Sequence, residues 1–288
     1  MSEESPSSAW TERRRLFREL HASGCFVIPN PWDTGAARLL AGLGFRALAT
    51  TSSGFAWSLG LQDNHVPLPE ALAHFRAVVR SVDLPVSADF EGGFAVEPSA
   101  VAANVKAAID TGVAGLSIED SSKDPAGAPL FDLTLAVERV RAARQAIDAG
   151  GTGVVLTARS EGFVAGRPDL RETLRRLAAY AEAGADCLFA PGVRAKGDVE
   201  AVVRAVAPKP VNVLMGGDFG TVAELAALGV RRISVGGALA RVAWTAFLEA
   251  AREIAGDGRF TRLARALPGA EVDALFRPGE AGLNYINH

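Results

Sequence analysis

The chain has 288 residues, of which 49% are hydrophobic and 22% charged, so it can bury a large core. Its net charge of −3 gives no electrostatic reason to expect nucleic acid, and no block of Lys and Arg indicates a membrane surface. No stretch approaches the length of a membrane span, and the acidic, Ser-rich start MSEESPSSAW does not resemble a signal peptide. We therefore expect a cytoplasmic protein with no nucleic-acid or membrane partner.

Eight apolar runs of strand length recur through the chain, and between them lie segments with helical spacing of apolar residues. The runs are continuous rather than alternating, which is typical of parallel strands buried on both faces. Eight such units without a break in composition predict a single (β/α)₈ TIM barrel, with an open doubly wound sheet as the alternative. The runs cover residues 25–29, 47–51, 86–89, 115–119, 154–159, 187–190, 211–215 and 232–235.

Helices are expected at both ends of this barrel. Residues 8–22 predict an N-terminal helix that covers the bottom of the barrel, and residues 239–255 predict a long final helix. The expected catalytic unit is therefore residues 1–255. Residues 256–288 form a C-terminal helical extension whose apolar residues no strand requires, so we expect it to pack on a partner subunit of a homodimer or homotetramer, with packing on its own barrel as the alternative.

Charged residues follow three consecutive predicted strands. Asp89 ends the third run and Glu91 follows it, Glu119 ends the fourth, and Arg159 ends the fifth. The carboxyl ends of parallel strands share one rim of the barrel, where such folds place their chemistry. Crowded carboxylates repel one another unless a cation lies among them, so the pattern predicts a Mg²⁺ site, with Mn²⁺ as a substitute.

The segment after the second run, residues 50–63, is rich in Ser, Thr and Gly and ends at Asp63. We expect a loop whose N–H groups and hydroxyls converge on a substrate carboxylate. Asn212, in the seventh run, is a further candidate for substrate contact or a core polar residue. Two glycine pairs, at residues 216–217 and 236–237, leave open a different function, a phosphate-binding barrel enzyme.

The motifs together resemble the isocitrate lyase/phosphoenolpyruvate mutase superfamily over about residues 20–255. The residues that carry the resemblance are Thr51-Ser52-Ser53-Gly54, Asp63, Asp89-Phe90-Glu91-Gly92-Gly93, Ser117-Ile118-Glu119-Asp120 and Thr157-Ala158-Arg159-Ser160-Glu161. The resemblance implies a (β/α)₈ barrel that binds Mg²⁺ and an α-oxo or α-hydroxy acid. It also implies C–C or P–C bond chemistry through an enolate-like species.

The resemblance assigns roles by position. Asp89 matches the acid that touches Mg²⁺ directly, and Asp63, Glu91 and Glu119 match acids that hold it mostly through water. Ser52, Ser53 and Gly54 match the segment that holds the substrate carboxylate, and Arg159 matches its cationic partner. We therefore expect Asp63, Glu119 and Arg159 to take part in catalysis, with Asn212 added to the substrate contacts.

One segment departs from the family pattern. Lyases of this superfamily carry a catalytic Cys and a His in the loop after the fourth strand, whereas residues 121–130 here read SSKDPAGAPL. The sequence therefore favours cleavage or decarboxylation of a small 2-oxo dicarboxylate similar to oxaloacetate, which needs little help from an acid. The alternatives are P–C chemistry on phosphonopyruvate or phosphoenolpyruvate, and a 2-oxo-acid-binding pseudoenzyme.

Overall fold

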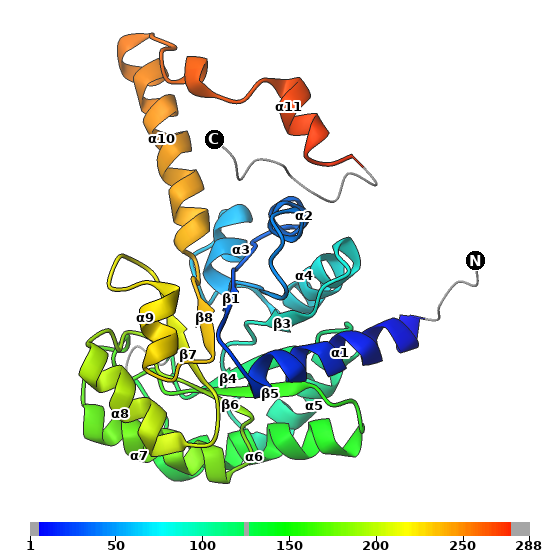
Figure 1. Cartoon of the computed structure of the whole chain (residues 1–288), viewed down its shortest axis with the longest axis vertical. Coiled ribbons are helices and arrows are strands. Elements are labelled where there is room, and N and C mark those ends of the chain that lie inside the picture. Colours follow the sequence, from blue (N-terminus) through cyan, green and yellow to red (C-terminus); the bar gives the residue numbers. More distant parts are fainter. Residues whose placement is uncertain (1–5, 124–126, 278–288) are drawn as a thin grey trace.

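Eight parallel strands alternate with helices around a barrel in the computed structural model, which describes residues 6–123 and 127–277 (Figure 1). The strands pair in the order β1-β8-β7-β6-β5-β4-β3-β2, all in parallel. The predicted (β/α)₈ TIM barrel is confirmed. The strands are β1 (Phe26–Ile28), β2 (Leu48–Ala49), β3 (Val86–Ala88), β4 (Gly115–Glu119), β5 (Val155–Arg159), β6 (Cys187–Phe189), β7 (Val211–Leu214) and β8 (Arg232–Ser234).

The barrel closes between β1 and β2, where the Ala49 N–H donates to the Pro29 carbonyl at 3.0 Å. The helices, in chain order, are α1 (Pro6–Ala22), α2 (Thr34–Gly42), α3 (Ser52–Ser58), α4 (Leu68–Ser81), α5 (Pro98–Ile109), α6 (Leu133–Ala149), α7 (Leu170–Glu182), α8 (Lys196–Val206), α9 (Val222–Ala227), α10 (Ala238–Asp257) and α11 (Gly269–Ala274). A single 3₁₀ turn, η1 (Leu263–Arg265), lies between the last two.

Helix boundaries follow local signals in the sequence. Asp33, Asp132 and Asp169 each accept a hydrogen bond from a backbone N–H of the first turn, which satisfies a group that the helix itself leaves unpaired. Gly112, which follows α5, has a φ of +92°, and a Cβ there would lie 2.5 Å from the Trp10 ring. Glycine is therefore required at this position both by the turn and by the approach of α1.

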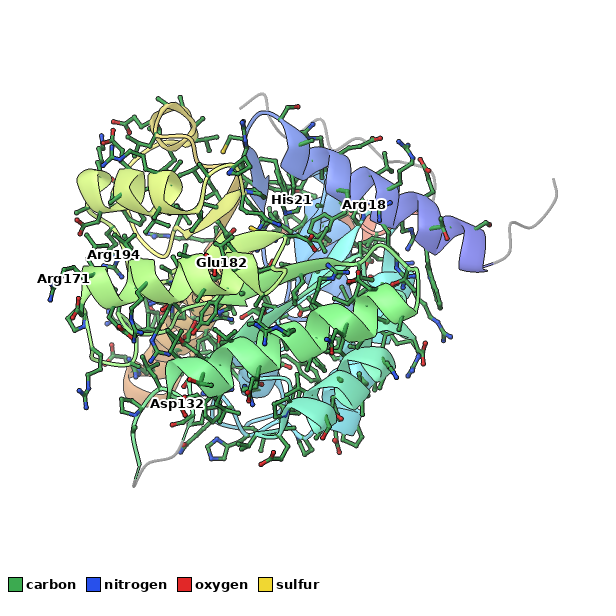
Figure 2. The ribbon with its side chains drawn as sticks, turned by 90° about the horizontal axis from the view of Figure 1, so that it is seen from below. Arg18, His21, Asp132, Arg171, Glu182 and Arg194 are labelled. Atoms are coloured by element: carbon green, nitrogen blue, oxygen red, sulfur yellow. The ribbon has the colours of Figure 1, made fainter. Side chains whose placement is uncertain are left out.

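Helix α1 lies across the amino-terminal end of the barrel, as the sequence predicts (Figure 2). Phe17 is fully buried, and Arg14 donates to the carbonyls of Val113 at 3.0 Å and Ile109 at 2.9 Å. Arg18 donates to the Gly153 carbonyl at 2.8 Å, just before β5. The helix thus closes the end of the barrel opposite the predicted site.

Helix α10 differs from the other barrel helices because most of its length extends away from the barrel (Figure 1). Its only buried residue is Ala240, whereas Val242 is 68% exposed and Phe247 is 59% exposed. The extension beyond it is described as far as residue 277, so residues 278–288 of the predicted C-terminal segment lie outside the described part. Within the described ranges, no helix combines the length and apolarity that crossing a membrane requires.

Candidate active site

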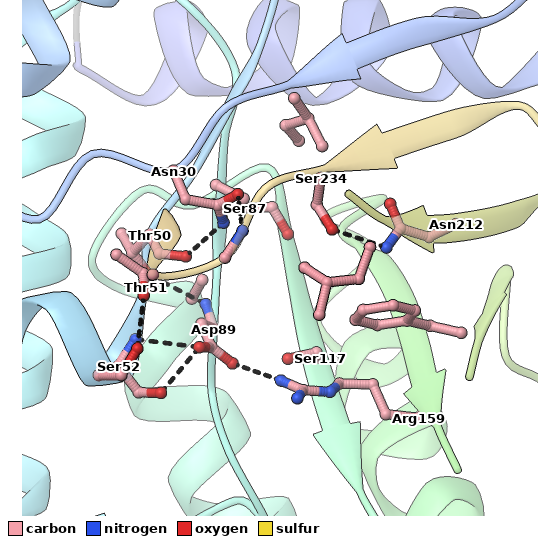
Figure 3. A pocket seen from close by; sticks show the side chains of 18 of the residues that line it. Asn30, Thr50, Thr51, Ser52, Ser87, Asp89, Ser117, Arg159, Asn212 and Ser234 are labelled. Atoms are coloured by element: carbon pink, nitrogen blue, oxygen red, sulfur yellow. Dashed lines mark hydrogen bonds and ion pairs between the residues drawn. The ribbon is translucent and has the colours of Figure 1, made fainter. Parts of the chain in front are cut away.

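A cavity of about 190 Å³ opens at the carboxyl-end rim of the barrel (Figure 3). Asp63, Asp89 and Arg159 line it near the rim, and Ser52 and Ser53 of α3 form one wall. Asn212, Arg232 and Ser234 line it from strands β7 and β8. The cavity therefore brings together six of the nine predicted substrate or metal residues, whereas Gly54, Glu91 and Glu119 do not line it.

Asp89 is held from two sides. One carboxylate oxygen accepts hydrogen bonds from both the N–H and the hydroxyl of Ser52, each at 2.9 Å, and the other accepts one from Arg159 Nη1 at 2.7 Å. Its own N–H donates to Thr50 Oγ1 at 2.9 Å. Because an ionised carboxylate offers about four lone-pair positions, these three bonds fix its direction and leave a position open toward the cavity.

Arg159 is surrounded by carboxylates. Besides Asp89, its Nη1 lies 3.3 Å from Glu119, and its Nε lies 2.9 Å from Glu161. The guanidinium also lies 5.2 Å from the centre of the Phe189 ring. Burial, opposed by Arg159, raises the pKa of Glu161, and the charges of Glu119 and Asp120 raise it further. The charge of Arg159 is thus largely matched by the protein's own acids.

Glu91 and Glu119 share a second cation, Lys123. Its ammonium forms an ion pair with Glu91 and lies 3.2 Å from Glu119. The sequence places Glu91 on the same side as Asp89 if the strand continues, but β3 ends at Ala88 and Glu91 has a left-handed φ of +49°. The side chain therefore turns into a neighbouring hollow beside Lys123 and Arg139 instead of the main cavity.

The predicted loop at residues 50–63 begins instead as helix α3. Thr51 caps it, accepting from the Gly54 N–H at 3.3 Å, and this places Ser52 against Asp89. Gly54, predicted to contact substrate, is buried, and a Cβ there would lie 2.7 Å from Thr51 and 2.9 Å from Trp32. Its small size serves packing within this corner of the barrel.

Below the rim, the interior of the barrel is polar. Barrel interiors are usually filled by bulky apolar side chains, but here small hydroxyl and amide groups point inward, from Ser87, Ser117, Thr157, Asn212 and Ser234. Among them lies Arg232, which is 5% exposed. It donates to Asn212 Oδ1 at 2.9 Å and to Thr157 Oγ1 at 3.0 Å.

Asp120, which follows Glu119 in the motif, belongs to a buried support beside the cavity. It accepts hydrogen bonds from the Tyr180 hydroxyl at 2.6 Å, from Arg176 at 3.1 Å and from the Glu161 N–H at 2.7 Å. These contacts hold Glu161 in place against Arg159.

A divalent metal fits the chemistry of the donors at this rim. In the described part of the chain, no three His, Cys, Asp or Glu side chains are arranged closely enough to bind a metal together. Mg²⁺, however, usually keeps several waters and takes only one or two carboxylates. Asp89 supplies an oriented oxygen, and Asp63, at the exposed edge of the cavity, supplies a second carboxylate. The residues therefore fit a water-rich site centred on Asp89.

Several site residues were not singled out from the sequence. Arg232 lies in a predicted strand where a charged residue is unusual. Lys123 could be noted from the sequence as a poor proton donor, but its pairing with Glu91 and Glu119 was not predicted. Asn30, which donates to the Thr50 carbonyl at 2.9 Å and accepts from the N–H groups of Val235 and Gly236, joins three strand ends at the rim. An Asn between two prolines, as in Pro29-Asn30-Pro31, does not indicate this role in a single sequence.

Known proteins share both the sequence and the fold. Residues 17–255 match the phosphoenolpyruvate phosphomutase family. A protein of Burkholderia cenocepacia, provisionally described as a lyase/mutase, has a solved structure that is 46% identical, with a TM-score of 0.92 over 95% of this chain and 99% of that one. An uncharacterized protein of Mycobacterium tuberculosis is 34% identical over 260 residues, 90% of this chain and 95% of the relative.

More distant relatives carry the names of enzymes. Oxaloacetate decarboxylase of Paraburkholderia xenovorans is 29% identical over 233 residues, 77% of this chain and 74% of the relative. Other similar proteins are named 2-methylisocitrate lyase, oxaloacetate acetylhydrolase and phosphoenolpyruvate phosphomutase. With the family match covering most of the barrel, the chain belongs to the isocitrate lyase/phosphoenolpyruvate mutase superfamily.

Proposed function

We propose that the protein is a lyase that depends on a divalent metal and decarboxylates or cleaves a small 2-oxo dicarboxylate similar to oxaloacetate. The observation that carries the proposal is the fixed Asp89 carboxylate, which Ser52 and Arg159 hold at the edge of a cavity large enough for a small acid. The oxaloacetate decarboxylases among the relatives support this choice of substrate.

The reaction on oxaloacetate breaks the bond between C3 and C4. Carbon dioxide leaves, the electron pair moves onto the 2-oxo oxygen, and protonation at C3 yields pyruvate. A divalent cation held by Asp89 and water would polarise the 2-oxo group and stabilise the charge that develops on its oxygen. The Ser53 hydroxyl faces the same cavity and can donate to the adjacent carboxylate, whereas Ser52 donates its only hydroxyl hydrogen to Asp89.

Arg159 positions the acids of the site. Its Nη1 and Nε hold Asp89 and Glu161 at the same time, so its guanidinium fixes the distance between two strands that carry carboxylates. Such preorganised charge stabilises the transition state without reorganisation during the reaction.

Turnover of 2-oxo acids with and without Mg²⁺ or Mn²⁺ tests the proposal, with metal alone as the control for uncatalysed decarboxylation. We expect metal-dependent release of pyruvate from oxaloacetate, and we expect Asp89→Asn to abolish it together with the metal-induced rise in Tm. Asp83→Asn serves as a matched control because Asp83 is fully exposed and pairs only with Arg13 in the described structure. Unchanged metal binding by Asp89→Asn would contradict the assignment of the metal site.

Phosphonopyruvate and phosphoenolpyruvate belong in the same panel because the family match is to a phosphomutase. Interconversion of these two compounds, with no turnover of oxaloacetate, would favour P–C chemistry. Binding of 2-oxo acids without any turnover would identify a pseudoenzyme.

A further inference from the structure

Arg232 supplies a buried positive charge within the cavity. It is the first residue of β8, it lines the cavity, and it is 5% exposed. Three of its five N–H groups have partners, which are Asn212 Oδ1, Thr157 Oγ1 and His21 Nε2. All three partners are polar groups that can remain neutral.

No carboxylate in the described part of the chain pairs with Arg232. Burial, together with Arg232 itself, lowers the pKa of His21 to about 3, so the imidazole is neutral at pH 7. The Cys187 thiol interacts electrostatically with Arg232, but burial raises its pKa and keeps it protonated. A buried cation without a counter-ion is costly, and a ligand anion would remove that cost.

Arg159, the cation at the rim, does have counter-ions, because three carboxylates lie within 3.3 Å of it. Lys123, at the next hollow, has two. Of these three cations, Arg232 is therefore the one whose charge the protein leaves unmatched.

The depth of Arg232 sets the size of the ligand. Its Nη2 contacts Thr157, which lies two residues before Arg159 on β5. Two residues of strand span about 7 Å, so the guanidinium lies about that far below the rim. This is comparable with the length of a four- or five-carbon dicarboxylate.

We propose that Arg232 binds the far carboxylate of a four- or five-carbon 2-oxo dicarboxylate whose 2-oxo end lies at the rim beside Asp89. The inference rests on the proposed function, because it assumes that a 2-oxo acid binds at the rim. Asn212, Thr157 and His21 hold the guanidinium in place and leave two N–H groups, one on each terminal nitrogen, for the ligand.

Calorimetry with Mg²⁺ present tests the inference by comparing the binding of pyruvate with that of 2-oxoglutarate, the five-carbon dicarboxylate. The KM for oxaloacetate gives the corresponding value for the four-carbon dicarboxylate. We expect the wild-type protein to bind a dicarboxylate about tenfold or more tightly than pyruvate. In Arg232→Gln this preference should fall to within about threefold while pyruvate binding is kept, since only the far carboxylate loses its partner. Arg231→Gln is the matched control, because Arg231 is the adjacent residue and donates outside the cavity to the Gly24 carbonyl.

Retention of the dicarboxylate preference in Arg232→Gln, or equal binding of pyruvate and dicarboxylates by the wild type, would overturn the inference alone. Failure of every 2-oxo acid to bind would instead overturn the proposed function. If Arg232→Gln does not fold, the 5-methyl ester of 2-oxoglutarate provides the test in the wild-type protein. The ester should bind no better than pyruvate, and an ester that binds as tightly as the diacid would refute the role of Arg232.

Discussion

Arg159 binds two carboxylates through different nitrogens, which a single ammonium cannot reproduce. In Arg159→Lys, either Asp89 or Glu161 loses its partner, so the site that receives the 2-oxo acid is no longer held in place. We expect the binding of 2-oxo acids to weaken by roughly tenfold or more, in keeping with the 1.5–3 kcal/mol typical of a hydrogen bond to a charged group. Calorimetric titration measures the change, and Arg175→Lys, on the exposed side of α7, is the control. Binding at wild-type strength in Arg159→Lys would show that charge alone, without the forked geometry, suffices.

Lys123 is the only residue of the 121–123 segment that could supply a proton to a departing carbanion, yet it is a poor donor. Burial lowers its pKa, but Glu119 and Glu91 outweigh this and raise the pKa above its ordinary value. Isocitrate and 2-methylisocitrate leave a succinate-like carbanion that needs a positioned acid, and such help is worth about 10²–10⁴ in rate. We therefore expect negligible cleavage of both compounds in a coupled glyoxylate or pyruvate assay. Robust cleavage would mean that another acid replaces the missing Cys.

The difference between Arg231 and Arg232 shows what a single sequence cannot reveal about a residue. Arg231 precedes the last apolar run and Arg232 begins it, but only the Arg232 side chain points into the barrel. Successive strand residues face opposite sides, so a shift of one position in register exchanges them. The rim acids could be predicted because the ends of strands are marked by the end of an apolar run. The inward face of β8 is fixed only by its pairing with β1 and β7.

Among the elements, α4 carries a histidine that links stability to pH. His74 stacks on Phe55 at 3.8 Å, and its Nε2 is buried without a partner. Burial lowers its pKa to about 4. As the pH falls below 6.5, the unfolded chain therefore binds a proton at His74 while the folded protein remains unprotonated there. This contribution to stability is fully present above pH 6.5 and is lost as the pH falls toward 4, by up to about 3 kcal/mol.

We expect His74→Phe to lose less stability between pH 7.5 and pH 5 than the wild type in urea titrations. Part of the loss should remain, because the pKa of His21 is lowered in the same direction. The exposed His65 gives the control variant His65→Phe. An identical pH dependence in His74→Phe and wild type would contradict this account.

Elements with a strong period were predictable, whereas α3 was not. The strands and long helices follow from apolar runs and spacing that the core enforces. Residues 52–58 contain Ser and Gly, which have modest helix propensity, and the sequence therefore favoured a loop. The missed signal was Thr51, whose side chain caps the helix. Gly54 also packs closely against Trp32 and Ala240, and this tertiary contact could not be predicted from the local sequence.

At the scale of the whole molecule, α10 and the extension expose apolar side chains that the barrel does not cover. Phe247 is 59% exposed, Phe260 61% and Leu267 59%. Exposed apolar surface of this kind usually marks an interface. We expect the full-length protein to be a dimer or tetramer in sedimentation velocity, and deletion of residues 257–288 to shift the mass toward the monomer. A full-length monomer would contradict the proposed packing on a partner.

The junction of β1 and β2 is the part of the barrel where local opening should be easiest. The other neighbouring strands are joined by ladders of two to five residue pairs. Between β1 and β2, the described structure has one backbone hydrogen bond, from Ala49 to Pro29, and one from the Asn30 side chain to the Thr50 carbonyl. Local opening is easiest where few bonds must break, so this seam should exchange its amide hydrogens sooner than β4 and β5. Asn30 and Thr50 also border the cavity. We therefore expect a bound acid to slow the local opening of this junction and the exchange of its amide hydrogens.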